Sequence, residues 1–192
     1  MRANITLILL IFLLLASTAS CIYFYREMRE YKELATHYRN ELKDLEREWA
    51  DRLWQAIISN LGSADNELSG WRYGEVNQAM REIHIHQAKY YLDMLYGIYL
   101  GMRDPPFSDE RFDNAGKPIG AIINIMNMLA DREPSAGHKK GYGIYMPDED
   151  LQVIANFIHD MYHHLNSQNW AMANQLADSI NRWCAQYRTE NP

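Results

Sequence analysis

The sequence predicts an all-α protein with an N-terminal single transmembrane helix, a long heptad-patterned membrane-proximal helix, and a compact helical bundle ending in an αα-hairpin. Three observations predict this fold class. The chain opens with an uncharged, largely apolar run, apolar residues then recur every three or four positions, and two helical stripes joined by a short turn close the chain. We expect domains at residues 1–25, 26–60 and 61–192.

Composition narrows the classes of function. The 192 residues carry 19 Lys and Arg against 25 Asp and Glu, a net charge of −6. This acidic balance argues against a nucleic-acid partner, which normally meets a clustered basic surface. The 5 Trp, 13 Tyr and 5 Phe are too many large side chains for a disordered chain, and 2 Cys exclude a disulfide framework.

The N-terminal segment predicts a membrane anchor. Arg2 and Arg26 bracket 23 uncharged residues, and a helix of that length spans about 35 Å, enough to cross a hydrocarbon core of about 30 Å. Tyr23, Phe24 and Tyr25 then lie where an interfacial aromatic belt is expected. Residues 1–25 are therefore interpreted as a single-pass anchor.

Two other interpretations of this segment remain open. Ser17 and Ala19 are small enough to occupy the −3 and −1 positions before the cut of a cleaved secretory signal. Thr18-Ala19-Ser20-Cys21 also resembles the lipobox of a bacterial lipoprotein, although Thr18 stands where Leu is usual.

The topology signals conflict. Arg26, Arg29 and Lys32 follow the apolar run, and the positive-inside rule alone favours a cytoplasmic body. A short Arg-bearing start before an apolar core is, however, typical of an export signal. We expect the body on the exported side, periplasmic or extracellular.

The membrane-proximal helix, residues 26–60, carries a coiled-coil pattern. Residues 24–60 contain neither Pro nor Gly, and large apolar residues alternate at spacings of four and three between charged positions. The interaction seam consists of Met28, Tyr31, Tyr38, Leu42, Leu45 and Trp49. It predicts contact with a protein partner or a homodimer through residues 28–49; the alternative is a helix packed on its own domain. Beyond Trp49 the apolar set shifts to Leu53, Ala56 and Ile57, which we expect to face the body.

The body is expected to alternate helices with glycine- and proline-rich loops. The predicted loops are 61–74, 103–118 and 133–147, and the helix between the first two is apolar nearly all round, which indicates a buried, central helix. Gly120 to Asp131 shows a short helical stripe whose Ile content leaves a strand possible. Residues 148–188 form the hairpin, opening with an acidic first turn that suits a helix N-terminus.

Two groups of residues are candidate cation ligands. His159 and His163 are four apart on one helix, a usable spacing for a metal. Glu82, His86 and Asp93 form a polar strip on the central helix that would bind a cation or move a proton if it lined a cavity. The competing interpretation of both groups is ordinary side chains at the edge of an apolar stripe.

One loop is a candidate anion site. His138, Lys139 and Lys140 lie between glycines, where backbone amides and two Lys side chains suit a phosphate or an anionic headgroup. The loop lacks the spacing of a nucleotide-binding P-loop, so a plain surface loop is the alternative.

No complete catalytic or cofactor motif occurs, so the sequence predicts neither catalytic residues nor a cofactor. We expect a membrane-tethered interaction or scaffold module, acting as a non-catalytic subunit or adaptor of a membrane-associated assembly. The alternative function is a ligand- or cation-binding sensory domain.

Overall fold

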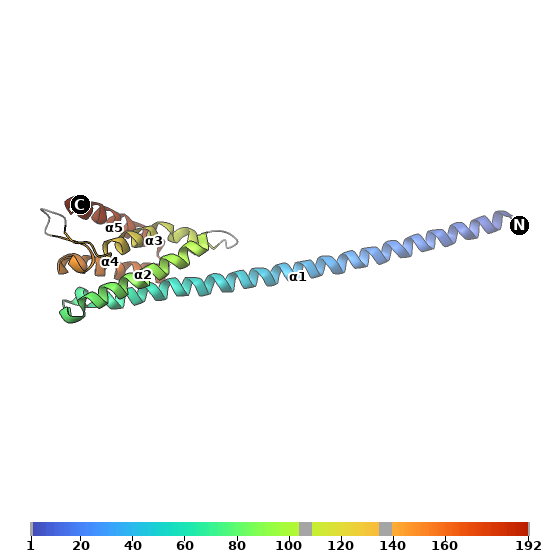
Figure 1. Ribbon diagram of the computed structural model, residues 1–192. Coiled ribbons are helices and arrows are strands. Elements are labelled where there is room, and N and C mark those ends of the chain that lie inside the picture. The colour runs from blue at the N-terminus through green and yellow to red at the C-terminus, as the bar shows by residue number, and fades with distance from the viewer. Residues whose placement is uncertain (1, 104–108, 135–139, 192) are drawn as a thin grey trace. The chain divides into compact units, whose positions relative to one another are not determined.

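The computed structural model describes residues 2–103, 109–134 and 140–191. These residues are helical apart from turns and one isolated bridge between Arg132 and Tyr142, which confirms the all-α prediction. The α-helices are α1 (Arg2–Tyr73), α2 (Arg81–Arg103), α3 (Glu110–Met128), α4 (Asp148–Asn166) and α5 (Trp170–Glu190), and short 3-10 helices form at η1 (Gln78–Met80) and η2 (Gly143–Tyr145) (Figure 1).

The chain divides into two compact units, residues 1–48 and 49–192. The first unit is the N-terminal part of α1. It contains one stretch that is long and apolar enough to cross a membrane, and none of that stretch is buried. Length and composition here fit a single-pass anchor, and a signal sequence would pass the same test.

The second unit begins with the remainder of α1, which carries a buried stripe of its own. Its members are spaced four and three apart and are at most 5 % exposed: Ala50, Trp54, Ile57, Leu61, Ala64, Leu68 and Trp71. The stripe begins one residue after Trp49, where the sequence predicts a change of phase. Ile57 is buried as expected, and Leu53 packs half-buried against the core.

The predicted loop at residues 61–74 is wrong, because α1 continues through it to Tyr73. Gly62 is a close-approach site: a Cβ there would lie 3.0 Å from the ring of Tyr162. The helix ends at Gly74, whose φ of +73° is one that glycine adopts without strain. Glu75 N–H donates to Gly70 C=O at 2.8 Å and Gly74 N–H to Trp71 C=O at 3.3 Å, which is a Schellman end.

The sequence predicts that α2 is buried nearly all round. In the structure only one of its faces is buried. The buried face is fully covered and consists of Ile85, Ala88, Leu92 and Leu95. The opposite face of α2 carries exposed apolar side chains. Because the two faces have similar composition, the sequence did not distinguish the one that meets the core.

Helix α3 begins at Glu110, earlier than predicted, so residues 110–118 of the expected loop at 103–118 are helical. Asp109 caps its N-terminus by accepting from Arg111 N–H at 2.9 Å. Pro118 lies inside the helix and is buried. Proline removes one helical hydrogen bond, but nine residues of α3 are buried, and this burial holds the helix together. The strand alternative for Gly120 to Asp131 is wrong.

The core of the second unit lies among these helices. Helix α3 packs mainly on α5, and α2–α3 and α4–α5 are also in contact (Figure 1). Helix α4 buries Leu151, Ile154, Ile158, Met161 and Leu165, and α5 buries Ala173, Ala177, Ile180, Cys184 and Tyr187, which confirms the apolar stripes predicted for both helices.

Candidate functional site

The interaction seam is exposed along its whole length. The side chains of Met28, Tyr31, Tyr38, Leu42, Leu45 and Trp49 are 52–72 % exposed. Leu34, beside the seam, is also exposed. In water such a row of large apolar groups on one helix side is unfavourable unless another surface covers it. The seam is therefore the first candidate site, and its chemistry is that of helix–helix association.

Polar and charged side chains pair with one another around the seam. Arg26 bonds Glu30 at 3.3 Å, Arg29 bonds Glu33 at 2.9 Å and His37 bonds Glu41 at 3.2 Å, each one turn apart. Such exposed pairs add a few tenths of a kcal/mol each to the helix.

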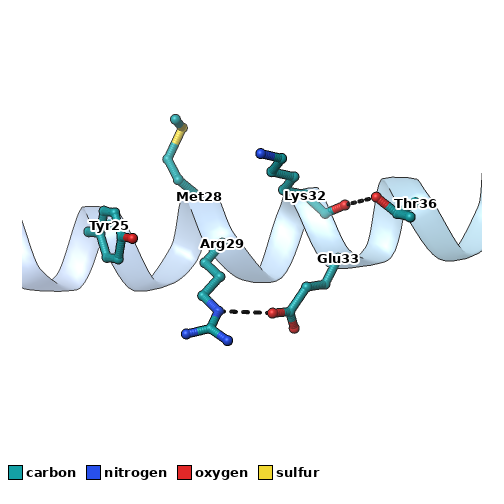
Figure 2. A pocket seen from close by; sticks show the side chains of 6 residues that line it. All are labelled: Tyr25, Met28, Arg29, Lys32, Glu33 and Thr36. Atoms are coloured by element: carbon teal, nitrogen blue, oxygen red, sulfur yellow. Dashed lines mark hydrogen bonds and ion pairs between the residues drawn. The ribbon is translucent and has the colours of Figure 1, made fainter.

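An open groove on this helix is lined by Tyr25, Met28, Arg29, Lys32, Glu33 and Thr36. Figure 2 shows Met28 and Lys32 projecting to one side of the helix, and the Arg29–Glu33 pair to the other. Because a single helix supplies all six residues, the groove is an open part of the helix surface and encloses no ligand cavity.

The exposed face of α2 is a second apolar surface. Ile83, Tyr90 and Met94 are 45–59 % exposed, although they sit on a well-packed helix. A Cβ added at Gly97 or Gly101 would meet no atom within 4 Å, so no other helix approaches these two glycines closely among the described residues. We call Ile83, Tyr90, Met94, Gly97 and Gly101 the outward face of α2.

The predicted His159/His163 pair lies beside a buried carboxylate. The two rings are in edge contact, with centroids 4.4 Å apart. His159 Nδ1 lies 3.1 Å from Asp65 Oδ2, and Asp65 also forms an ion pair with Arg72. Sequence reasoning missed Asp65, because it lies 94 positions from His159 and inside a predicted loop.

A polar pocket of about 420 Å³ adjoins this cluster. It lies between α1 and α4, and its lining includes Asp65, Asn66, Ser63, Tyr162 and Asn166. Asp65 is 7 % exposed and already holds two partners, so its carboxylate contributes to the packing of α1 on α4.

Two members of the predicted strip of Glu82, His86 and Asp93 have polar partners outside the strip. His86 Nε2 lies 2.7 Å from Asp131 Oδ2, and Asp93 accepts from Lys89 Nζ at 2.7 Å. Burial of Asp131 opposes its ionisation, but hydrogen bonds from Ile144 N–H and from His86 outweigh it and lower the pKa of Asp131. His86 and Asp93 thus each pair with a different residue.

Of the predicted anion-binding loop, His138 and Lys139 lie outside the described residues. Lys140 forms an ion pair with Asp150 at 2.9 Å. This bond raises the pKa of Lys140 above its usual value, against a smaller opposing effect of burial. In the described part of the loop, the positive charge of Lys140 is therefore already paired with a carboxylate.

Asp148 is the centre of a network that joins α4 to three other helical segments, α1, η1 and α2. Its carboxylate accepts from Trp71 Nε1 at 2.8 Å and from Gln78 Nε2 at 3.0 Å, and it forms an ion pair with Arg81. Burial alone would raise the pKa of Asp148, but the bonds from Trp71, Gln78 and Arg81 lower it. The acidic start of α4 is predicted by the sequence; the network that uses it is not.

The remaining chemistry of the described residues is limited. They contain no group of three His, Cys, Asp or Glu side chains placed to hold a metal, so the two cation-site hypotheses stay predictions. Burial raises the pKa of Cys184 to about 11, and its thiol therefore stays protonated at neutral pH.

Comparison of the chain with protein-family models, curated proteins and solved structures found no match.

Proposed function

We propose that this protein is a membrane-tethered, non-catalytic helical module that holds a protein partner, or a subunit of a larger assembly, beside the bilayer. One observation carries the proposal: the seam exposes six large apolar side chains on a helix in the membrane-proximal part of the chain. A surface of this kind on a soluble segment marks an interaction site.

The tether follows from the apolar stretch at the N-terminus of α1. We propose that residues 1–25 remain attached as a single-pass anchor, with the aromatic residues Tyr23, Phe24 and Tyr25 at the interface. We further propose that the body lies on the exported side, because the short Arg-bearing start before the apolar run is typical of an export signal. The seam starts three residues after Tyr25, so a partner bound there is held next to the membrane.

The body offers a second surface for such an assembly. We propose that α4 and α5 form a helical hairpin that, with α3, supports α2 from inside. This support leaves the outward face of α2 available to an apolar partner, and Gly97 and Gly101 allow that partner to approach the backbone closely.

The alternative function, cation binding, is favoured by one contact. A carboxylate on Nδ1 orients an imidazole so that Nε2 is free to bind a metal, and Asp65 lies at that position on His159. Zinc titration of the full chain tests it: His163→Ala removes the binding if the pair is a site, whereas binding that survives in this variant rejects it.

Membrane fractionation and crosslinking test the main proposal. The full chain is expected to resist carbonate extraction and to retain its N-terminus by mass spectrometry. Crosslinking in membranes is expected to give adducts of higher mass that Leu42→Glu abolishes. Asn40→Glu, an equally exposed change on the outer side of the same helix, is the control and is expected to retain them.

Two outcomes would contradict the proposal. A diacylglyceryl group on Cys21 as the first residue, or release of the chain by carbonate, would reject the transmembrane anchor. Adducts that persist in Leu42→Glu would show that the seam is not the contact surface.

A further inference from the structure

We propose that the seam is covered by a second copy of this chain, parallel and in register, in a two-stranded coiled coil over residues 28–49. This inference rests on the proposed function, because two anchors that enter one membrane from the same side hold their seams parallel and at the same height. It goes further by naming the partner and the register.

The spacing of the seam is that of a supercoiled pair. Met28, Ala35, Leu42 and Trp49 occupy the a positions of a heptad, and Tyr31, Tyr38 and Leu45 occupy the d positions. An average spacing of 3.5 residues is the repeat of a two-stranded coiled coil, in which two helices with the same repeat wind around each other and keep the seam continuous. A second copy has that repeat in the same phase.

The exposed area is of the size that an interface needs. Buried Tyr and Trp side chains cover about 150–250 Å² each, and the three rings of the seam are all more than half exposed. Met28, Leu34, Leu42 and Leu45 add four exposed aliphatic side chains. Covering all seven buries several hundred Å² per helix, approaching the roughly 800 Å² per partner of stable interfaces.

The charges that flank the seam give predictions that hold only for the parallel, in-register pair. In a parallel pair, a residue at g faces the e residue of the following heptad on the other chain. Glu27 at g then faces Lys32 of the second copy, which is attractive. Glu41 at g faces Glu46 of the second copy, which is repulsive. Figure 2 shows Lys32 on the same side of the helix as the seam residue Met28.

These two pairs predict that two substitutions change the stability of the dimer in opposite directions. Lys32→Glu turns the attraction with Glu27 into repulsion and weakens the dimer. Glu46→Lys turns the repulsion with Glu41 into attraction and strengthens it. Each pair occurs twice in a symmetric dimer, so we expect roughly tenfold changes in the dissociation constant in opposite directions. Neither packing of the seam on its own chain nor an unrelated partner requires this pattern.

The experiment measures energy transfer between two labelled populations of the full chain, reconstituted in liposomes at a series of protein-to-lipid ratios. The variants are Lys32→Glu, Glu46→Lys and the double change Glu27→Lys with Lys32→Glu, which restores the attraction with its sign exchanged. Lys43→Glu is the matched control, because it makes the same change of charge on the outer side of the helix, at a b position.

The expected result is weaker association for Lys32→Glu, recovery in the double variant, stronger association for Glu46→Lys and no change for Lys43→Glu. Absence of self-association in the wild-type chain, or equal effects of Lys32→Glu and Lys43→Glu, would overturn the proposal. If the chain does not self-associate but still gives seam-dependent adducts with another protein, the inference fails and the proposed function stands. If neither association occurs, both fail.

Discussion

Replacing Asp148 tests whether its network holds the second unit together. The Trp71 ring is 3 % exposed, so its N–H loses its partner in Asp148→Ala, and an unpaired buried donor costs about 1–3 kcal/mol. The bonds from Gln78 and Arg81 contribute less, because the Asp148 side chain is 49 % exposed and solvent screens them. We expect Asp148→Ala to lower the free energy of unfolding by about 2–3 kcal/mol at pH 7.

Urea unfolding of the full chain in a mild detergent, followed by tryptophan fluorescence, measures this difference. Glu149→Ala is the matched control, since it removes another first-turn carboxylate of α4 and so shares the helix-dipole effect, worth about 0.3–1 kcal/mol. A loss in Asp148→Ala no larger than that in Glu149→Ala would refute the reasoning, because it would leave nothing for the hydrogen bonds to contribute.

The same network predicts a pH dependence with a definite sign. The pKa of Asp148 is lowered in the folded chain from an ordinary value of 3.8. Its contribution is therefore complete above that value and is lost as the pH falls through the lower pKa of the folded state. The stability difference between wild type and Asp148→Asn should stay constant from pH 7 to about pH 5 and narrow only below about pH 4.

Two further predictions concern burial and association. Ile158 and Ile180 are fully buried on α4 and α5, so either one changed to Ala should cost roughly 2–4 kcal/mol in urea unfolding, and a cost below about 0.5 kcal/mol would contradict their burial. Single cysteines at Tyr31 or Leu42, with the native cysteines replaced, should crosslink between chains in oxidised membranes, whereas one at Ile57, which is 0 % exposed, should not; failure at both seam positions would favour a seam packed on its own chain.

Local patterns predict helix type and burial where one stripe dominates. Helix α4 starts at the acidic turn beginning with Asp148, and the stripes of α4 and α5 are buried as their spacing indicates. Glycine and proline are misleading when they sit in packed helices. Gly62 and Pro118 are both signals of a loop, yet Gly62 allows the Tyr162 ring to approach, and Pro118 is held by the burial of α3.

The candidate sites depend on contacts that no local pattern contains. His159 and His163 are recognisable as a pair, but the carboxylate beside them comes from Asp65 on a different helix. Likewise, His86 is part of a strip by spacing, while the structure pairs it with Asp131, 45 residues away. Spacing therefore predicts which residues share a helix face, and only the packing of helices determines which polar groups meet.

Helix α1 carries two apolar stripes, and the buried one can be compared with the seam. From Ala50 to Trp71 a stripe with alternating spacings of four and three is buried to 5 % exposure or less. From Met28 to Trp49 a stripe with the same spacing is more than half exposed. The two stripes differ in composition, since only the exposed one contains tyrosines and only the buried one contains isoleucine. Tyr31 and Tyr38 can bury their rings while their hydroxyls reach water at the rim of an interface, a role for which tyrosine is suited. The distal stripe belongs to the core of the second unit, and under the proposed function the proximal stripe is the surface that a partner covers.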